Sequence, residues 1–458
     1  MSFENALTLA DYDIKKHKKL LTMKKSTILF ISIALFCLLS NEAFSQCFGT
    51  GADSAITIST TKNINTDVIA TGRTYADGIA YRVNVPADGA GSVTRYNGTV
   101  TISNGIAPGD EVILINLQGA PGDIADVGNY EFMKVATATA STITFTDSIT
   151  RSYDGTSASN QKVVIQRVPN YTDVTITSPG LLTASDYHLG EGAPPLSTLP
   201  TGTAGYYTGI VAFKATGTVS IGSGAGINVS FKGYLGGRNA SGVTRHGEGP
   251  DEMPGTGPGG AQTANCGGSA GRGGGYGTNG GGTGTGGLAY GNADLSTINL
   301  GGAGGSNGGG GDCNGPFAGH SGGIIHIVTD SISVSGTISA NGEQGGTNGE
   351  GPVGGGSGGA IFLAGYGMAL GSGLVTATGG AGAEGGGAGG DGRIRVEYGS
   401  SLSGTTSPAD SVATVNFGYN IVDTPIKICT NDSALIYGTY KTTAATYYDS
   451  LTTINGCD

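Results

Sequence analysis

Short apolar runs that alternate with polar residues, and that are separated by turn residues, dominate the chain between residues 46 and 204. They occur in four segments: Thr99–Ile102, Glu111–Leu117, Thr142–Phe145 and Lys162–Val168. Alternation with a period of two is typical of strands that bury one face. The close spacing of such short strands favours a sandwich or barrel over βαβ units. We therefore predict that residues 46–204 form an all-β module, a β-sandwich or small barrel.

A loose repeat follows over residues 205–400. Four segments share one strand opening, and begin at Gly209 (GIVAFKA), Gly323 (GIIHIV), Gly359 (GAIFLA) and Gly392 (GRIRVEY). The first three are each followed by two further short strands and then by a glycine run. One cassette is too small to bury its own apolar face, so stacked cassettes must share a core. The pattern predicts a glycine-rich parallel β-solenoid.

The last repeat shows which side chains should face inward. Ile394, Val396 and Tyr398 share one face of the strand, and Arg393, Arg395 and Glu397 share the other. Glycines at the corners allow a positive φ and close backbone approach. For the long glycine runs, residues 255–287 and 301–311, two alternatives stay open: packed polyglycine-type helices or mobile loops.

The ends of the chain carry different signals. Met23-Lys24-Lys25 precedes the apolar run Ile28–Leu39, and Ala43-Phe44-Ser45 supplies small residues before a cleavage site at Gln46. This three-part pattern predicts a secretory signal peptide over residues 23–45 behind an upstream extension, with an uncut anchor as the alternative. No other segment is apolar enough to span a membrane. Residues 401–420 are interpreted as a linker and residues 421–458 as a partial Cys-containing β repeat, cut short in mid-unit.

Composition narrows the function classes. The chain has 458 residues, of which 88 are Gly and none is Trp, and only 12% are charged. The net charge of −11 argues against nucleic-acid binding, because phosphate recognition needs a basic surface. The Ile- and Val-rich runs between the glycines argue against a disordered chain.

The cysteines of the mature chain predict disulfides. We expect one bond between Cys429 and Cys457 in the terminal unit and one between Cys266 and Cys313, which flank the glycine-rich excursion. A zinc site is the rival interpretation, but no CxxC pair or His cluster supports it.

No pattern predicts catalysis or a resident cofactor. Glycine is so frequent that GxGxxG matches arise by chance, and none opens a helix after a strand. His188, His246, His320 and His326 are scattered, and solvent or strand-face roles are expected for them. The adjacent pair Asp251-Glu252 is expected to be solvated rather than to act as a glycosidase pair. A calcium site is a further candidate, built from the hard oxygen ligands Asp123, Asp126, Asn129 and Glu131.

A short Asp-Ser pattern, followed by a small or aliphatic residue, recurs six times. It resembles the O-glycosylation sequon of Bacteroidetes proteins, and the alternative is that Asp-Ser is a common turn at the entry to a strand. The resemblance implies glycans on six serines: Ser54, Ser148, Ser331, Ser411, Ser433 and Ser450.

Longer motifs carry a resemblance to known families. Gly109–Ile115 (GDEVILI), with Arg167–Thr172 (RVPNYT), and the cassettes at Ser333 and Gly389 resemble large glycine-rich bacterial cell-surface and adhesin-like proteins. The terminal segment Tyr447–Asp458 resembles a repeat of Bacteroidetes proteins exported by the type IX system. The glycine-rich stretch is also similar to the extracellular domain of anaplastic-lymphoma-type receptor kinases, but neither HRD nor DFG occurs in the chain, so no kinase domain is present.

These resemblances imply a non-enzymatic, structural or adhesive protein, secreted and held at the outer cell surface. Its expected partners are surface glycans or extracellular matrix. The alternative is a carbohydrate-active or carbohydrate-binding β-solenoid protein.

Overall fold

The computed structural model describes most of the chain between residues 48 and 417 and two short strands beyond it. The described residues are 48–85, 89–96, 101–120, 122–155, 161–187, 208–237, 239–240, 243–244, 247–251, 259–260, 271–282, 286–306, 317–347, 351–415, 417, 434–436 and 439–441. They fall into two compact units. Residues 48–417 form one unit, and the segments 1–47 and 418–458 form the other.

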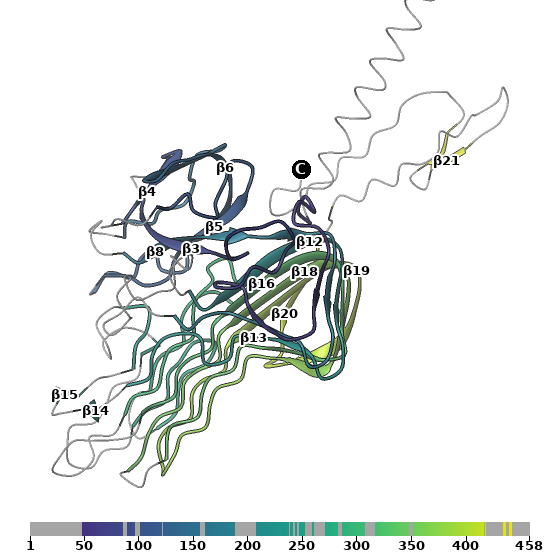
Figure 1. Ribbon diagram of the computed structural model, residues 1–458. Coiled ribbons are helices and arrows are strands. Elements are labelled where there is room, and N and C mark those ends of the chain that lie inside the picture. Colours follow the sequence, from purple (N-terminus) through teal and green to yellow (C-terminus); the bar gives the residue numbers. More distant parts are fainter. Residues whose placement is uncertain are drawn as a thin grey trace, which may run out of the picture. The chain divides into compact units, whose positions relative to one another are not determined.

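The larger unit is built around a parallel sheet that coils into a solenoid (Figure 1). Its first face contains seven strands: β1 (Ile56–Ile58), β10 (Val174–Ile176), β12 (Ile210–Ile221), β16 (Ile324–Val334), β18 (Ala360–Thr376), β19 (Arg393–Ser407) and β20 (Ser411–Thr414). β9 (Asn170–Tyr171) pairs with the beginning of this face. The second face contains β2 (Thr61–Asn63), β11 (Leu181–Thr183), β13 (Gly226–Asn228), β17 (Thr337–Ser339) and the last part of β18. Each coil of the chain therefore contributes one strand to each face.

The register of the long strands confirms the predicted repeat. Ile210 pairs with Ile324, Ile324 with Ala360, and Ala360 with Arg393, so the four glycine-led openings lie side by side. Ile394 and Val396 lie in one continuous apolar core, and Tyr398 packs against it. Stacking gives each short cassette a buried face that it could not form alone.

A closed antiparallel barrel is inserted between the first and second coils. Six strands form it: β3 (Ala80–Asn84), β4 (Ser92–Arg95), β7 (Thr142–Phe145), β6 (Tyr130–Ala138), β5 (Glu111–Asn116) and β8 (Val163–Val168). Its core is separate from that of the solenoid and includes Val93, Leu114, Ile143 and Ile165. The prediction of an all-β chain with a small barrel and a parallel solenoid is confirmed, but the barrel interrupts the solenoid instead of preceding it.

The solenoid extends beyond the predicted range 205–400 at both ends. β1 and β2 precede the barrel, yet β1 pairs with β10 and β2 with β11 in the solenoid sheet. Within the predicted linker 401–420, the end of β19 and all of β20 continue the stack. The strands β1 and β2 have three residues each, and the end of β19 is rich in Ser, Thr and Gly. Such segments join the sheet through neighbouring backbone rather than through an apolar pattern of their own.

The glycine-rich segments form hydrogen bonds that repeat every three residues. The N–H groups of Gly355 and Gly358 donate to the segment 387–390, those of Gly354 and Ser357 donate to the segment 302–305, and those of Gly356 and Gly359 donate to the segment 340–343. In a strand, successive N–H groups point alternately in two directions. Here every third N–H group points to the same neighbour, and three residues per turn is the geometry of a polyproline-type helix. The described parts of these runs therefore pack as polyglycine-type helices, the first of the two alternatives.

Glycine is required in these helices because neighbouring backbones touch. A Cβ atom on Gly356 would lie 2.0 Å from the carbonyl oxygen of His320, and one on Gly387 would lie 1.9 Å from that of Gly281. No side chain fits at such a distance. In the described glycine-rich segments, glycine therefore serves close packing of the backbone.

Smaller elements complete the description. Within the larger unit, β14 (Asn239–Ala240) and β15 (Val243–Thr244) form an antiparallel pair. In the other unit, β21 (Ala434–Ile436) pairs antiparallel with β22 (Thr439–Lys441). The predicted signal peptide, residues 23–45, lies outside the described residues. Where residues are described, no helix has the length and apolar character needed to cross a bilayer.

Candidate binding surface of the solenoid

The outer sides of the two solenoid faces differ in accessibility. On the first face, the outward residues Ala212, His326 and Phe362 lie at neighbouring register positions and are all buried. Tyr130 and Phe132 of the barrel strand β6 contact this row through His326. The part of the first face next to the barrel is therefore covered, whereas outward residues further along its strands, such as Ser333 and Ser401, are exposed.

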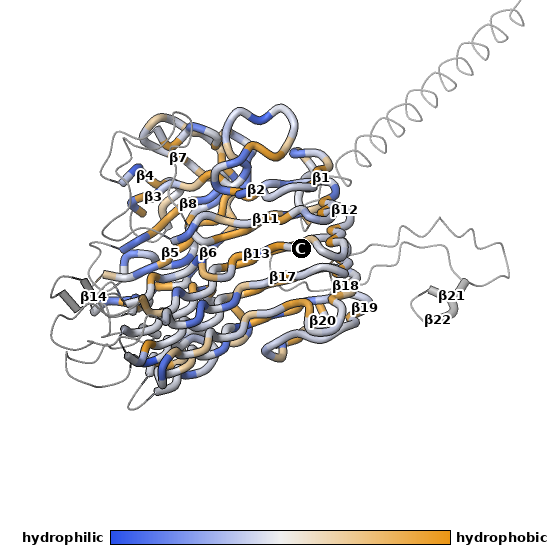
Figure 2. The backbone as a smooth tube through the Cα atoms, turned by 60° about the horizontal axis from the view of Figure 1, so that its bottom comes forward, coloured by the Kyte–Doolittle hydropathy of each residue, from blue (hydrophilic) through white to orange (hydrophobic). Residues whose placement is uncertain are grey.

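The outer side of the second face carries neutral polar residues in register. Figure 2 shows its strands β11, β13 and β17 side by side. Leu182, Ile227, Ile338 and Val375 point into the core, so the residues beside them point outward. One outward column contains only amides and hydroxyls: Asn63, Thr183, Asn228, Ser339, Thr376 and Ser407. All are half-buried except Ser339, which is buried. Consecutive members lie about 4.8 Å apart, the spacing of paired strands.

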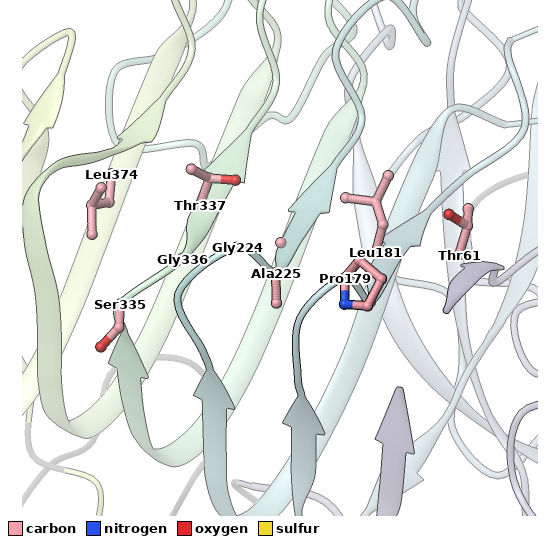
Figure 3. Close-up of a pocket in the computed structure, with 11 residues that line it drawn as sticks. Thr61, Pro179, Leu181, Gly224, Ala225, Ser335, Gly336, Thr337 and Leu374 are labelled. Carbon is pink, nitrogen blue, oxygen red and sulfur yellow. The ribbon is translucent and has the colours of Figure 1, made fainter. Parts of the chain in front are cut away.

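A second outward column has a glycine at its centre. It runs through Thr61, Leu181, Gly226 and Thr337 and reaches Leu374 on β18. Only Gly226 lacks a side chain, and a Cβ atom there would lie 2.7 Å from the Oγ1 atom of Thr337 and 3.4 Å from the Cδ1 atom of Leu181. Figure 3 shows these side chains in a row across the coils. The side chains of Thr337 and Leu181 therefore close over Gly226, which is buried, and the groove runs along this column and the chain corners beside it.

The corners between the two faces form one wall of this groove. In the second and third coils the corners span residues 177–180 and 222–225, four residues each. In the first and fourth coils they span only two, residues 59–60 and 335–336. Gly224 takes a φ of +74°, which favours glycine, and lets the longer corner turn. Because the corners differ in length from coil to coil, the surface beside the second column is uneven.

The groove is uncharged and open. It has a volume of about 410 Å³, within the range of small-ligand sites. Thr61, Ser335 and Thr337 supply hydroxyl groups, while Pro179, Leu181, Ala225 and Leu374 supply apolar surface. No Asp, Glu, Lys, Arg or His is among its lining residues. A neutral molecule with both hydroxyl groups and C–H surface fits this chemistry best.

A buried histidine marks the contact between the barrel and the first face. The His326 ring stacks on Phe362, with centroids 4.5 Å apart, and lies 4.7 Å from the ring of Phe132. Burial, and then the nearby charge of Lys214, lower the pKa of His326 to about 3. The expected strand-face role of His326 is therefore correct for its position, but the side chain is enclosed rather than solvated. It is a packing residue that stays neutral.

An ion-pair network joins the barrel to the first coil, and the sequence did not predict it. Arg167 donates from Nη2 to the Asp53 carboxylate at 2.7 Å and from Nε to Asp110 at 2.9 Å. Arg73 lies 4.0 Å and 3.9 Å from the same two carboxylates. The side chains of Arg167 and Asp53 are almost fully buried. These groups lie far apart in the sequence, so only the fold brings them together.

Two of the four calcium candidates, Asp126 and Glu131, already accept hydrogen bonds with their carboxylates. The carboxylate of Asp126 accepts from the backbone of Gly155 at 2.7 Å, and that of Glu131 accepts from Thr150 and Arg151 at 2.9 Å each. Asn129 donates to the carbonyl oxygen of Ser152, and Asp123 is buried. Within the described ranges, no three His, Cys, Asp or Glu side chains converge as metal ligands. A calcium site stays a prediction.

The serines of the Asp-Ser pattern occupy different environments. Ser54 and Ser148 are exposed. Ser331 is half-buried with its Oγ atom 2.9 Å from that of Thr218, and Ser411, also half-buried, accepts from Arg395 at 3.0 Å. Ser433 and Ser450 lie outside the described residues. Glycosylation of these serines stays a prediction.

Several other predicted residues also lie outside the described part of the chain. They are Cys266, Cys313, Cys429, Cys457, His188, His246 and Glu252. Asp251, expected to be solvated, is instead buried, and its carboxylate accepts a hydrogen bond from the backbone of Gly122 at 3.2 Å. His320 pairs with Glu343 at 3.0 Å. The two predicted disulfides stay predictions.

Comparisons with known proteins give no family for this chain. No protein-family model and no curated protein matches it. Among solved structures, it is similar to a tailspike of Acinetobacter baumannii bacteriophage AP22 in complex with a capsular saccharide (10% identity, 79% of this chain, 62% of that one, TM-score 0.17). A tailspike of Pseudomonas phage phi297 aligns at 12% identity over 77% of this chain and 54% of that one, with a TM-score of 0.16. The chain thus spans less than two thirds of either tailspike, and TM-scores this low carry no argument about fold or function.

Proposed function

We propose that this chain is a secreted, non-enzymatic adhesive or structural protein of the glycine-rich bacterial cell-surface type. The observation that supports this best is the second face of the solenoid, where one outward column of hydroxyl and amide groups repeats coil after coil. A stack of this kind offers an extended surface for contacts with glycans or matrix. The apolar core shared by the coils supports that surface from within.

Carbohydrate binding is favoured over carbohydrate cleavage by one feature of the groove. A glycosidase needs two carboxylates about 5–10 Å apart on either side of the scissile bond. The groove lining contains neither Asp nor Glu. Its hydroxyl groups can hold a sugar but offer no acid of suitable strength to protonate a leaving group.

Attachment assays test the proposed function. Beads coated with the purified full chain should adhere to surfaces carrying glycans or extracellular matrix, and soluble chain should compete with them. Beads coated with a heat-denatured sample of the same chain are the control. Equal adhesion of native and denatured coatings, or no adhesion on any surface, would contradict an adhesive role.

A further inference from the structure

The groove on the second face has a defined direction and length. Its lining comes from five successive coils, from Thr61 in the first to Leu374 in the fifth. Four spacings between paired strands correspond to roughly 19 Å. The groove therefore runs across the strands, and an elongated ligand would lie perpendicular to them.

Its chemistry alternates along this direction. A hydroxyl group at Thr61 is followed by the apolar Leu181, then the buried Gly226, then the hydroxyl of Thr337 and the apolar Leu374. A pyranose chain presents the same mixture, with C–H surface on the ring faces and hydroxyl groups at the edges. Charged ligands are disfavoured, because the lining supplies no counter-charge to offset their desolvation.

From this arrangement we infer that the groove binds a neutral, linear oligosaccharide laid across the coils. Its sugar rings lie along the column and contact Thr61 and Leu181 at one end and Ser335, Thr337 and Leu374 at the other. The inference rests on the proposed adhesive function, since it names the ligand class of that surface. Affinity for a single short ligand is modest, and repeated ligands on a surface raise it through multivalency.

A glycan array of neutral and acidic oligosaccharides, probed with the full chain, tests the inference. The wild-type chain should retain neutral linear glycans. Thr337→Arg places a long side chain across the groove from an exposed position and should weaken retention by roughly tenfold or more. Ser333→Arg is the matched control, because Ser333 is exposed on the same coil but outside the groove lining, and its retention should equal that of the wild type.

A second variant controls for the case in which Thr337→Arg fails to fold. Thr337→Val removes the hydroxyl but keeps the shape and suits a strand, so it should fold normally and weaken retention by roughly threefold to tenfold. If neither Thr337 variant changes the retention of neutral glycans, the groove assignment is overturned and the proposed adhesive function still stands. Retention of acidic glycans alone would overturn the ligand class. If no glycan binds while beads still adhere to matrix, the inference fails and the proposed function survives.

Discussion

His326 and Phe362 stack on one another across neighbouring strands, with ring centroids 4.5 Å apart and an angle of 11° between the planes. The stack lies between the solenoid and the barrel, where Phe132 closes it from the barrel side. A charged imidazolium would be costly in this place, because no carboxylate is paired with it and Lys214 adds a like charge. The barrel and the first face are thus joined by a group that must remain neutral.

The first prediction concerns pH. The pKa of His326 falls from 6.5 to about 3 on folding. Between these values the unfolded chain binds a proton that the folded chain does not, so stability decreases as pH falls, by up to about 1.4 kcal/mol per pH unit. His326→Phe should therefore reduce the slope of unfolding free energy between pH 5 and 6.5. Denaturant melts at several pH values measure it, and equal slopes for both proteins would show that His326 is not buried.

The second prediction tests the solenoid core. Ile394 pairs with Ile361 and is 2% exposed. Ile394→Asp places an unpaired charge in the shared core and should lower the free energy of unfolding by about 4 kcal/mol or more, with loss of a cooperative transition. Ser401→Asp, at an exposed position of the same strand, should melt like the wild type. Unchanged melting of the Ile394 variant would refute the assigned register.

The third prediction tests the polyglycine packing. Gly356→Ala brings a methyl group against the carbonyl of His320, so the helices must move apart. We expect a loss of about 1–3 kcal/mol in the free energy of unfolding. Gly91→Ala is the control, because a Cβ atom there meets nothing within 4 Å. If both substitutions have the same small effect, these helices are not closely packed.

The fourth prediction concerns the ion-pair network between the barrel and the first coil. Arg167→Met leaves the buried carboxylate of Asp53 without its main partner. The expected loss is about 3–5 kcal/mol, because an uncompensated charge remains inside. Adding Asp53→Asn should recover part of that loss. A double variant as unstable as the sum of both single ones would mean that the two residues are not coupled.

The repeat could be predicted from the sequence, but the residues at which the solenoid begins and ends could not. The openings at Gly323 and Gly359 share an apolar pattern, so their register could be read directly. β1 and β2 could not be recognised as the first coil, because each has three residues and the barrel separates them from their partners. A short strand with small polar residues carries too little pattern to show which sheet it joins.

The candidate site was less accessible to sequence reasoning than the fold. The groove depends on the register of one column across five coils and on two-residue corners beside four-residue ones. This register can be read from the cassettes only once β11 and β2 are known to belong to the stack.

Competition in the bead assay tests the central claim most directly, because it links adhesion to the groove. Beads coated with the full chain are placed on a surface carrying the neutral oligosaccharide that the array ranks first. Adhesion should decline in a saturable manner as the soluble oligosaccharide is added, and beads coated with the Thr337→Arg variant should adhere weakly from the start. Adhesion that soluble sugar does not reduce, and that Thr337→Arg leaves intact, would contradict the account.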